Sequence, residues 1–210
     1  MTNPRRVTVY IDGFNLYYGM LKPNPSMKWL DLQALAEALA PGVAVTVRYF
    51  TARVKPLPNH PNAQKKQSLY IRALETTAIE IKYGHFTTKE TTAAVVTPVG
   101  SKVRFERVWK TEEKGSDVNL GTYLLLDGVD QLYDEALVIS DDSDLAEPIN
   151  QAAKRFGPVH IVSPRAMRLA AFSGASSCRA LDPAIVAASQ LPSPLTLTSG
   201  NIIERPPDWS

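Results

Sequence analysis

The feature that most constrains the fold is the alternation of short apolar runs with segments of helical spacing. Strand-like runs occur at residues 7–11, 43–50, 79–86, 136–140 and 159–162. Helix-like segments occur at residues 30–40, 63–76, 116–126 and 144–156. Strands that alternate with helices predict an α/β fold with a mostly parallel sheet covered on both faces. We expect residues 159–162 to form the last core strand.

A β-hairpin is predicted as an insertion in this alternation. Residues 91–97 and 102–109 are strand-like, and they flank the turn residues Pro98-Val99-Gly100. We therefore expect one antiparallel hairpin in addition to the parallel sheet.

The C-terminal end is expected to form a tail. Residues 183–210 are proline-rich and irregular, so we predict one domain over residues 1–182 followed by this tail. Ile202, Ile203 and Trp209 are too apolar to favour a free, solvated coil. We expect them to pack on the body or on a second subunit of a homodimer.

Composition excludes several classes of protein. No apolar run reaches the length of a membrane span and the N-terminal residues lack a signal-peptide pattern, so we expect a cytoplasmic protein with no membrane partner. Cys178 is the only cysteine, which excludes a disulfide framework and a cysteine-based zinc site. The histidines at 60, 85 and 160 match no spacing of metal ligands.

The formal net charge of +2 hides a strong asymmetry along the chain. Residues 48–110 contain twelve Lys or Arg against four Asp or Glu, whereas residues 112–147 contain eleven acids and one base. A basic segment beside an acidic one suits a protein that holds a polyanion against a carboxylate-bound cation. Two ordinary solvated faces would give the same counts, so charge alone leaves both interpretations open.

Three carboxylates, Asp141, Asp142 and Asp144, follow the apolar run at residues 136–140. Carboxylates this close repel one another, and burying one without a partner costs free energy. Asp144 and Glu147 have the spacing of a capping box, so a helix N-terminus accounts for one acid. The remaining acids require a basic partner or a metal ion.

A second polar group follows the first strand. Asp12 ends the run at residues 7–11, and Asn15 can hold a neighbouring carboxylate or a phosphate oxygen by hydrogen bonds. A common Asp-Gly turn, with Gly13, is the alternative. In parallel sheets the ligand site lies beyond the carboxyl ends of the strands, so Asp12 and Asp142 should meet if their strands are neighbours.

A further acid stands at the start of a helix. With Ser116 as the N-cap, Asp117 occupies the first turn, where a negative charge suits the helix dipole. Asp117 also shares a helical face with Leu120, so it should point toward the core. Lys114 could pair with an acid or contact a substrate phosphate. Inward carboxylates on three separate segments favour Mg²⁺ or Mn²⁺, which prefer oxygen ligands.

Three motifs carry a resemblance to a known family. VYIDGFNLYYG, EKGSDVNL and LVISDDSDLAEPI occur in this order between Val7 and Val162, and they resemble the NYN family, a branch of the PIN-like metal-dependent ribonucleases. The tail motifs SQLP and PPDW resemble a bacterial subgroup. Many members have Gly at the position of Asp141 and a further Asp at the position of Tyr123.

The resemblance implies a fold and a site. The fold is a three-layer α/β/α sandwich, and the cofactor is Mg²⁺ or Mn²⁺. The implied metal ligands are Asp12, Asp117, Asp142 and Asp144. Asn15 is implied to lie beside them.

We therefore expect a metal-dependent endoribonuclease with RNA as its partner. A metal-activated water would attack phosphorus in line, leaving 5′-phosphate and 3′-hydroxyl ends. The expected substrate-binding residues are Lys102, Arg104, Arg107, Lys114 and Ser140. Tyr17, Tyr18 and Trp109 could stack on bases, although we favour a place in the core for each.

One other class of function stays open, and the sequence argues against two more. An RNA-binding or scaffold protein with a weakened metal site is the main alternative, and Tyr123 favours it. An aspartyl-phosphate phosphatase would need Asp-x-Asp after its first strand, where IDGFN has a single Asp. A P-loop NTPase would need a G-x-x-x-x-G-K-[ST] loop, which the sequence lacks.

Overall fold

A computed structural model describes residues 5–55, 61–96, 98, 100, 102–165 and 172–209. The core is a six-stranded parallel sheet, which confirms the predicted α/β class. In spatial order its strands are β3 (Glu80–Tyr83), β2 (Ala44–Thr51), β1 (Arg6–Asp12), β6 (Glu135–Ile139), β7 (Val159–Ser163) and β8 (Ser177–Ala180). Residues 159–162 lie in β7, the last strand with a buried pattern, and β8 adds an edge strand that was not predicted. Its sequence, SCRA, is too short and polar to read as a strand.

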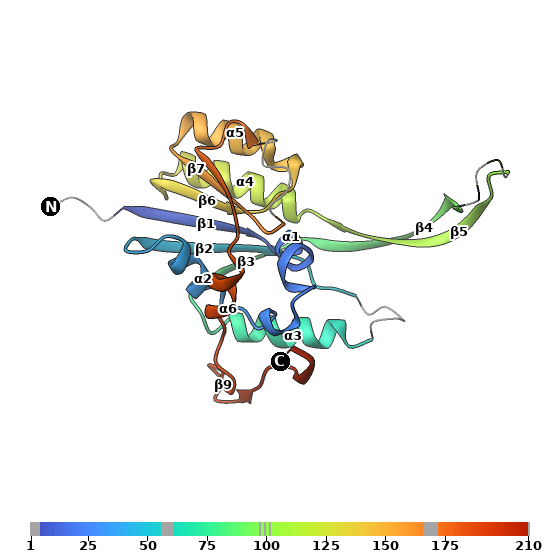
Figure 1. The fold of residues 1–210 in the computed structure, drawn as a ribbon, viewed down its shortest axis with the longest axis horizontal. Helices are drawn as coiled ribbons and strands as arrows, with labels where there is room; N and C mark the ends of the chain where they lie inside the picture. Colours follow the sequence, from blue (N-terminus) through green and yellow to red (C-terminus); the bar gives the residue numbers. More distant parts are fainter. Residues whose placement is uncertain are drawn as a thin grey trace.

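Helices cover both faces of the sheet, as the three-layer prediction requires (Figure 1). One face is covered by α4 (Ser116–Val129) and α5 (Ala146–Arg155), and the other by α2 (Leu32–Leu39), α3 (Ala63–Leu74) and α6 (Pro183–Ala188). Strand residues alternate between two apolar clusters: Tyr10 faces the first layer, while Val9 and Ile11 face the second.

Short helical turns connect these elements at the edge where the strands end. They are α1 (Gly13–Leu16), the π-helical turn η1 (Tyr17–Leu21), and the 3₁₀ turns η2 (Pro25–Met27) and η3 (Ser143–Leu145). The π-helical turn directly follows α1, which begins at the end of β1. Such turns occur frequently at functional sites.

The hairpin consists of β4 (His85–Ala94) and β5 (Phe105–Lys114), and it projects from the body (Figure 1). It is longer than predicted, and the run expected at residues 79–86 is divided at Gly84 between β3 and β4. A Cβ at Gly84 would lie 2.6 Å from the Lys114 carbonyl oxygen. The two segments can therefore approach this closely only if residue 84 is glycine. Of the predicted strand and turn residues, Thr97 and Val99 lie outside the described part of the chain.

The C-terminal segment packs on the body. It contains α6, a two-stranded ribbon of β9 (Leu195–Thr196) and β10 (Ile202–Ile203), and the 3₁₀ turn η5 (Pro207–Trp209). The Trp209 ring lies 6.2 Å from Trp29 and 6.1 Å from Tyr70. Ile203 is buried and Ile202 is exposed. Within the described ranges, no helix is long and apolar enough to cross a membrane.

Candidate active site at the carboxyl ends of the strands

The loops that follow β1 and β6 meet, because the two strands are direct neighbours in the sheet. The Ser140 hydroxyl donates to Asp12 Oδ2 at 2.8 Å, and the Asn15 amide N–H donates to Asp12 Oδ1 at 2.9 Å. The Asn15 side-chain oxygen accepts the Asp141 N–H at 3.1 Å. These bonds hold Asp12, the N-cap of α1, against the loop after β6.

A pocket of about 350 Å³ opens at this edge. It brings together four of the predicted site residues, Asp12, Asn15, Asp117 and Asp142. Its other lining residues are Phe14, Tyr18, Phe86, Thr111, Glu113, Ser116 and Arg165. The pocket therefore combines the ends of β1 and β6, the start of α4 and the base of the hairpin.

Burial and repulsion between carboxylates raise the pKa of Asp12 and of Asp117 in this pocket. Burial raises the pKa of Asp12 from 3.8 to about 7, and the charges of Asp117 and Asp142 add to the shift. The hydrogen bonds from Asn15 and Ser140 oppose it. The pKa of Asp117 is also raised, first by burial and then by repulsion from Asp142 and Glu113. A cation in the pocket would relieve this repulsion.

Glu113, which the sequence analysis missed, organises the start of α4. Its two carboxylate oxygens accept the Ser116 N–H at 3.1 Å and the Ser116 hydroxyl at 2.8 Å. The N-cap itself is Gly115, with a φ of 97°, so the prediction of Ser116 as the N-cap was wrong. Glu113 thus presents a further carboxylate to the pocket and helps to place Asp117.

Asp142 and Asp144 occupy different environments. Asp142 Oδ1 accepts the Asp144 N–H at 3.0 Å and so caps η3, while the Asp142 side chain still lines the pocket. Asp144 is exposed and does not line the pocket, although its charge contributes to the raised pKa of Asp117. Asp141 is buried, accepting the Ser163 hydroxyl at 3.1 Å and lying 3.4 Å from Arg165 Nη1.

Arg165 is a second site residue that the sequence analysis missed. It is the one basic side chain among the described residues that line the pocket. It lies directly beyond the carboxyl end of β7, the strand next to β6. The rule that led to Asp12 and Asp142 would have found it, had it been applied to every strand of the sheet.

The predicted basic residues of the hairpin lie outside the pocket. Arg104 pairs with Glu106 at 3.0 Å, Arg107 pairs with Glu90, and Lys114 pairs with Glu112 at 3.2 Å. All three side chains are largely exposed. Lys102 is also exposed.

The aromatic residues expected in the core are exposed instead. Tyr17 and Tyr18 lie on η1, with Tyr18 at the rim of the pocket, and Trp109 projects from the hairpin. The prediction of core positions was therefore wrong for all three. The motif YY follows a short helix at the sheet edge, and its rings pack on each other at 5.3 Å rather than inward.

Tyr123, where many family members have an Asp, lies outside the carboxylate pocket. Its ring is 6.0 Å from Phe50, and it lies under the cationic groups of Arg48 and Lys82 at 5.2 and 4.5 Å. Its environment is the interface between α4 and the β2–β3 edge of the sheet.

The donor set suits a hard divalent cation, because every carboxylate of the pocket offers oxygen ligands. Among the described residues, no three acidic or other ligating side chains already converge as a metal cluster. Mg²⁺ commonly binds through one or two carboxylates and keeps several waters. Asp12, Asp117 and Asp142 are the side chains that would hold such an ion.

An open parallel sheet with an acidic pocket at its carboxyl edge defines a PIN-like α/β domain. Residues 6–182 match the NYN domain family, and the chain belongs to this family. The curated relative 6-hydroxy-3-succinoylpyridine 3-monooxygenase from Pseudomonas putida is 30% identical over 171 residues, which cover 69% of this chain and 54% of that protein. The chain therefore spans about half the length of that relative.

A solved structure has the same fold. It is a protein of unknown function from Vibrio parahaemolyticus, similar with a TM-score of 0.51 and 14% sequence identity. The match covers 87% of this chain and 97% of that one. At this identity the likeness extends to the fold alone.

The pH dependence of metal-free stability should report on Asp12. Its pKa is higher in the folded state than the ordinary value of 3.8, so its contribution to stability is present below about pH 4 and is lost as the pH rises toward 7. The loss should be on the order of 2–4 kcal/mol. Urea denaturation in EDTA at pH 4.5 to 7.5 would measure it for wild type and for Asp12→Asn. Parallel curves for the two proteins would contradict the prediction.

Proposed function

We propose that the protein is a metal-dependent endoribonuclease that hydrolyses RNA phosphodiester bonds. The observation that carries the proposal is the pocket in which Asp12, Asp117 and Asp142 meet from three separate segments. Membership of the NYN family supports a nuclease-type domain. Mg²⁺ or Mn²⁺ is the proposed cofactor, RNA the proposed partner and the cytoplasm the proposed location.

The chain's own residues have distinct tasks in this proposal. When bound, the metal would activate a water for attack and neutralise charge on the phosphate. Asp12, Asp117 and Asp142 would hold it, and Ser140 and Asn15 fix Asp12 through their hydrogen bonds. Arg165, at the pocket and 43% exposed, can donate to a non-bridging phosphate oxygen. Asp144 would join the ligands only by moving from its exposed position.

An RNA-binding protein with a weakened metal site is the second candidate. One observation favours it: the carboxylates do not already converge as a metal cluster among the described residues. Both candidates predict RNA binding, but only the first predicts cleavage that depends on a divalent ion. Tyr123 does not discriminate between them, because its ring lies outside the pocket.

The test is a cleavage assay on a labelled RNA of mixed sequence. We expect cleavage in Mn²⁺ or Mg²⁺, none in EDTA, and products with 5′-phosphate and 3′-hydroxyl ends. Binding without cleavage in either metal would select the second candidate. Oxygenation of 6-hydroxy-3-succinoylpyridine, given oxygen and an electron donor and without RNA cleavage, would replace both.

A further inference from the structure

The projecting hairpin has two faces of different chemistry. In its antiparallel register, Phe86 pairs with Glu113, Thr88 with Thr111 and Glu90 with Trp109. Paired residues share a face, and successive residues alternate between faces. The Thr88 and Thr111 hydroxyls lie 3.1 Å apart, as this assignment requires. One face therefore carries the even-numbered residues from 86 to 94 and the odd-numbered residues from 105 to 113, and we call it the aromatic face.

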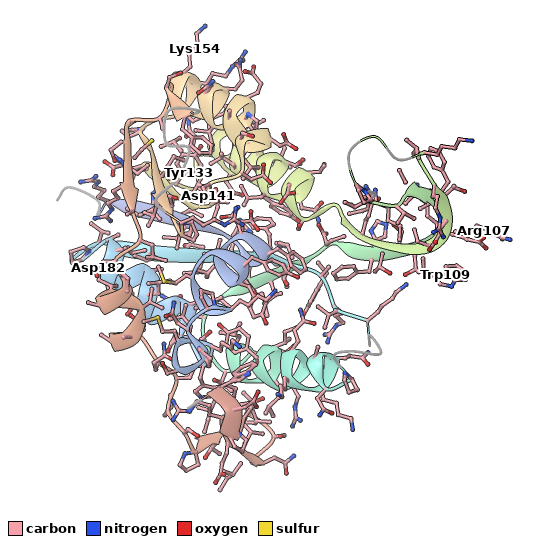
Figure 2. All side chains as sticks on the ribbon, turned by 45° about the vertical axis from the view of Figure 1, so that its right-hand side comes forward. Arg107, Trp109, Tyr133, Asp141, Lys154 and Asp182 are labelled. Carbon is pink, nitrogen blue, oxygen red and sulfur yellow. The ribbon has the colours of Figure 1, made fainter. Side chains whose placement is uncertain are left out.

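The aromatic face is continuous with the acidic pocket. Phe86, Thr111 and Glu113, at its inner end, all line the pocket. The row then leads outward to Trp109, Arg107 and Phe105. Figure 2 shows Arg107 and Trp109 on the projecting hairpin, with Asp141 in the body. A molecule that occupies the pocket can thus extend along this face without crossing another element.

The rings on this face are unusually exposed. Trp109 is 73% exposed and Phe105 is 64% exposed, whereas Trp29 and Trp209 are buried. Exposing large rings to water is unfavourable, and groups of them commonly mark binding sites. The ion pair of Arg107 with Glu90 lies on the same face, so the two rings do not form one apolar patch.

We infer that the aromatic face binds single-stranded RNA by base stacking and leads it to the pocket, an inference that rests on the proposed function. Aromatic rings on an open surface stack on any unpaired base, while the bases of a duplex are already stacked and paired. Arg107 can exchange its ion pair with Glu90 for an ion pair with a phosphate, or its guanidinium can stack on a base. From position 105 to 113 the face is about 27 Å long at a rise of about 3.4 Å per residue. That is the reach of roughly eight stacked nucleotides.

A second copy of the chain is the competing occupant of this face. Arg107 favours RNA, because its guanidinium can pair with a phosphate, and the Glu90–Arg107 ion pair interrupts the apolar surface that two copies would bury. The aromatic face is also continuous with the carboxylate pocket, and this continuity suits a chain-like molecule that occupies both. Dimer formation through Trp109 is therefore an outcome that would overturn the inference.

Trp109 is the exposed one of the three tryptophans, and its emission is identified as the part that Trp109→Leu removes. The experiment measures tryptophan fluorescence and anisotropy of labelled 12-nucleotide RNA in EDTA, with the full chain. We expect the single strand to quench the emission of Trp109 and a 12-base-pair duplex to leave it nearly unchanged. Trp109→Leu and Phe105→Leu should each weaken single-strand binding roughly tenfold, the scale of one stacked base. Val108→Ala is the matched control, because Val108 lies on the opposite face and is itself partly exposed.

Three binding results would overturn the inference. They are binding of the single strand with no change in Trp109 emission, equal weakening by Val108→Ala and Trp109→Leu, and a Trp109-dependent dimer in light scattering. The proposed function fails separately. Absence of cleavage in Mn²⁺ with intact stacking would remove the nuclease alone, and cleavage of single strands unaffected by Trp109→Leu would remove the stacking face alone.

Discussion

Asp127→Ala should destabilise the fold by about 3–5 kcal/mol, because it leaves the Arg48 guanidinium without its buried partner. Arg48 Nε lies 2.6 Å from Asp127 Oδ2, and Arg48 Nη2 donates to Asp127 Oδ1 at 2.9 Å. The Tyr10 hydroxyl also donates to Asp127 Oδ2, at 2.6 Å. All three residues are buried, so water cannot replace the lost acceptor. The measurement is the free energy of unfolding from urea denaturation at pH 7.

A triple variant provides the control for this prediction. Arg48→Met, Asp127→Leu and Tyr10→Phe together remove every polar member of the buried contact. Replacing a buried ion pair by apolar residues of similar volume is often neutral, so the triple variant should be more stable than Asp127→Ala. Glu80, the other partner of Arg48, is about half exposed and can return to solvent. A cost below about 1 kcal/mol for Asp127→Ala would contradict the argument.

The Arg48–Asp127 pair also has a consequence for the site. Tyr10 lies two residues before Asp12 on β1. Asp127 lies on α4, the helix whose first turn contains Asp117. The contact therefore fixes the helix against the strand that carries the other acid. We expect Asp127→Ala to lower any cleavage activity even at temperatures where the variant remains folded.

The strands that carry the site and three of its acids could be predicted because they depend on local patterns. The apolar runs that end in Asp12 and Ser140 identify β1 and β6, and the edge rule for parallel sheets then places the acids at the same edge. That β1 and β6 are direct neighbours is seen only in the structure. The start of α4 is similarly visible, because Asp117 shares a face with apolar residues. These inferences need only periodicity and the ends of elements.

The missed features depend on contacts between distant segments. Asp127, in LLLDGVD, resembles an acid near a helix end, and its burial is compensated by Arg48, 79 residues earlier. Glu113 lines the pocket because of the hairpin register, which pairs it with Phe86. The edge strand β8 has no apolar pattern. In each case the determining partner is not a sequence neighbour.

Asp142→Asn should reduce the rate of RNA cleavage by at least about 100-fold. Removing a single group that stabilises the transition state typically lowers kcat by this factor or more. Asparagine caps a helix as well as aspartate, so η3 should keep its start and the fold should be retained. Removing the Asp142 charge also relieves the repulsion that raises the pKa of Asp12 and Asp117. Metal-free stability should therefore stay constant or rise.

The same variant should lose the stabilisation that metal gives to the wild type. Mn²⁺ at about 100 times its dissociation constant should stabilise the wild type by roughly 2.7 kcal/mol, and most of this gain should vanish in Asp142→Asn. Asp182→Asn is the matched control, because it changes the same group in an α6 cap outside the pocket. Melting temperatures measured against Mn²⁺ concentration test all three proteins. A flat wild-type curve up to millimolar Mn²⁺ would show that no cation compensates these aspartates, and the nuclease proposal would then lose its physical basis.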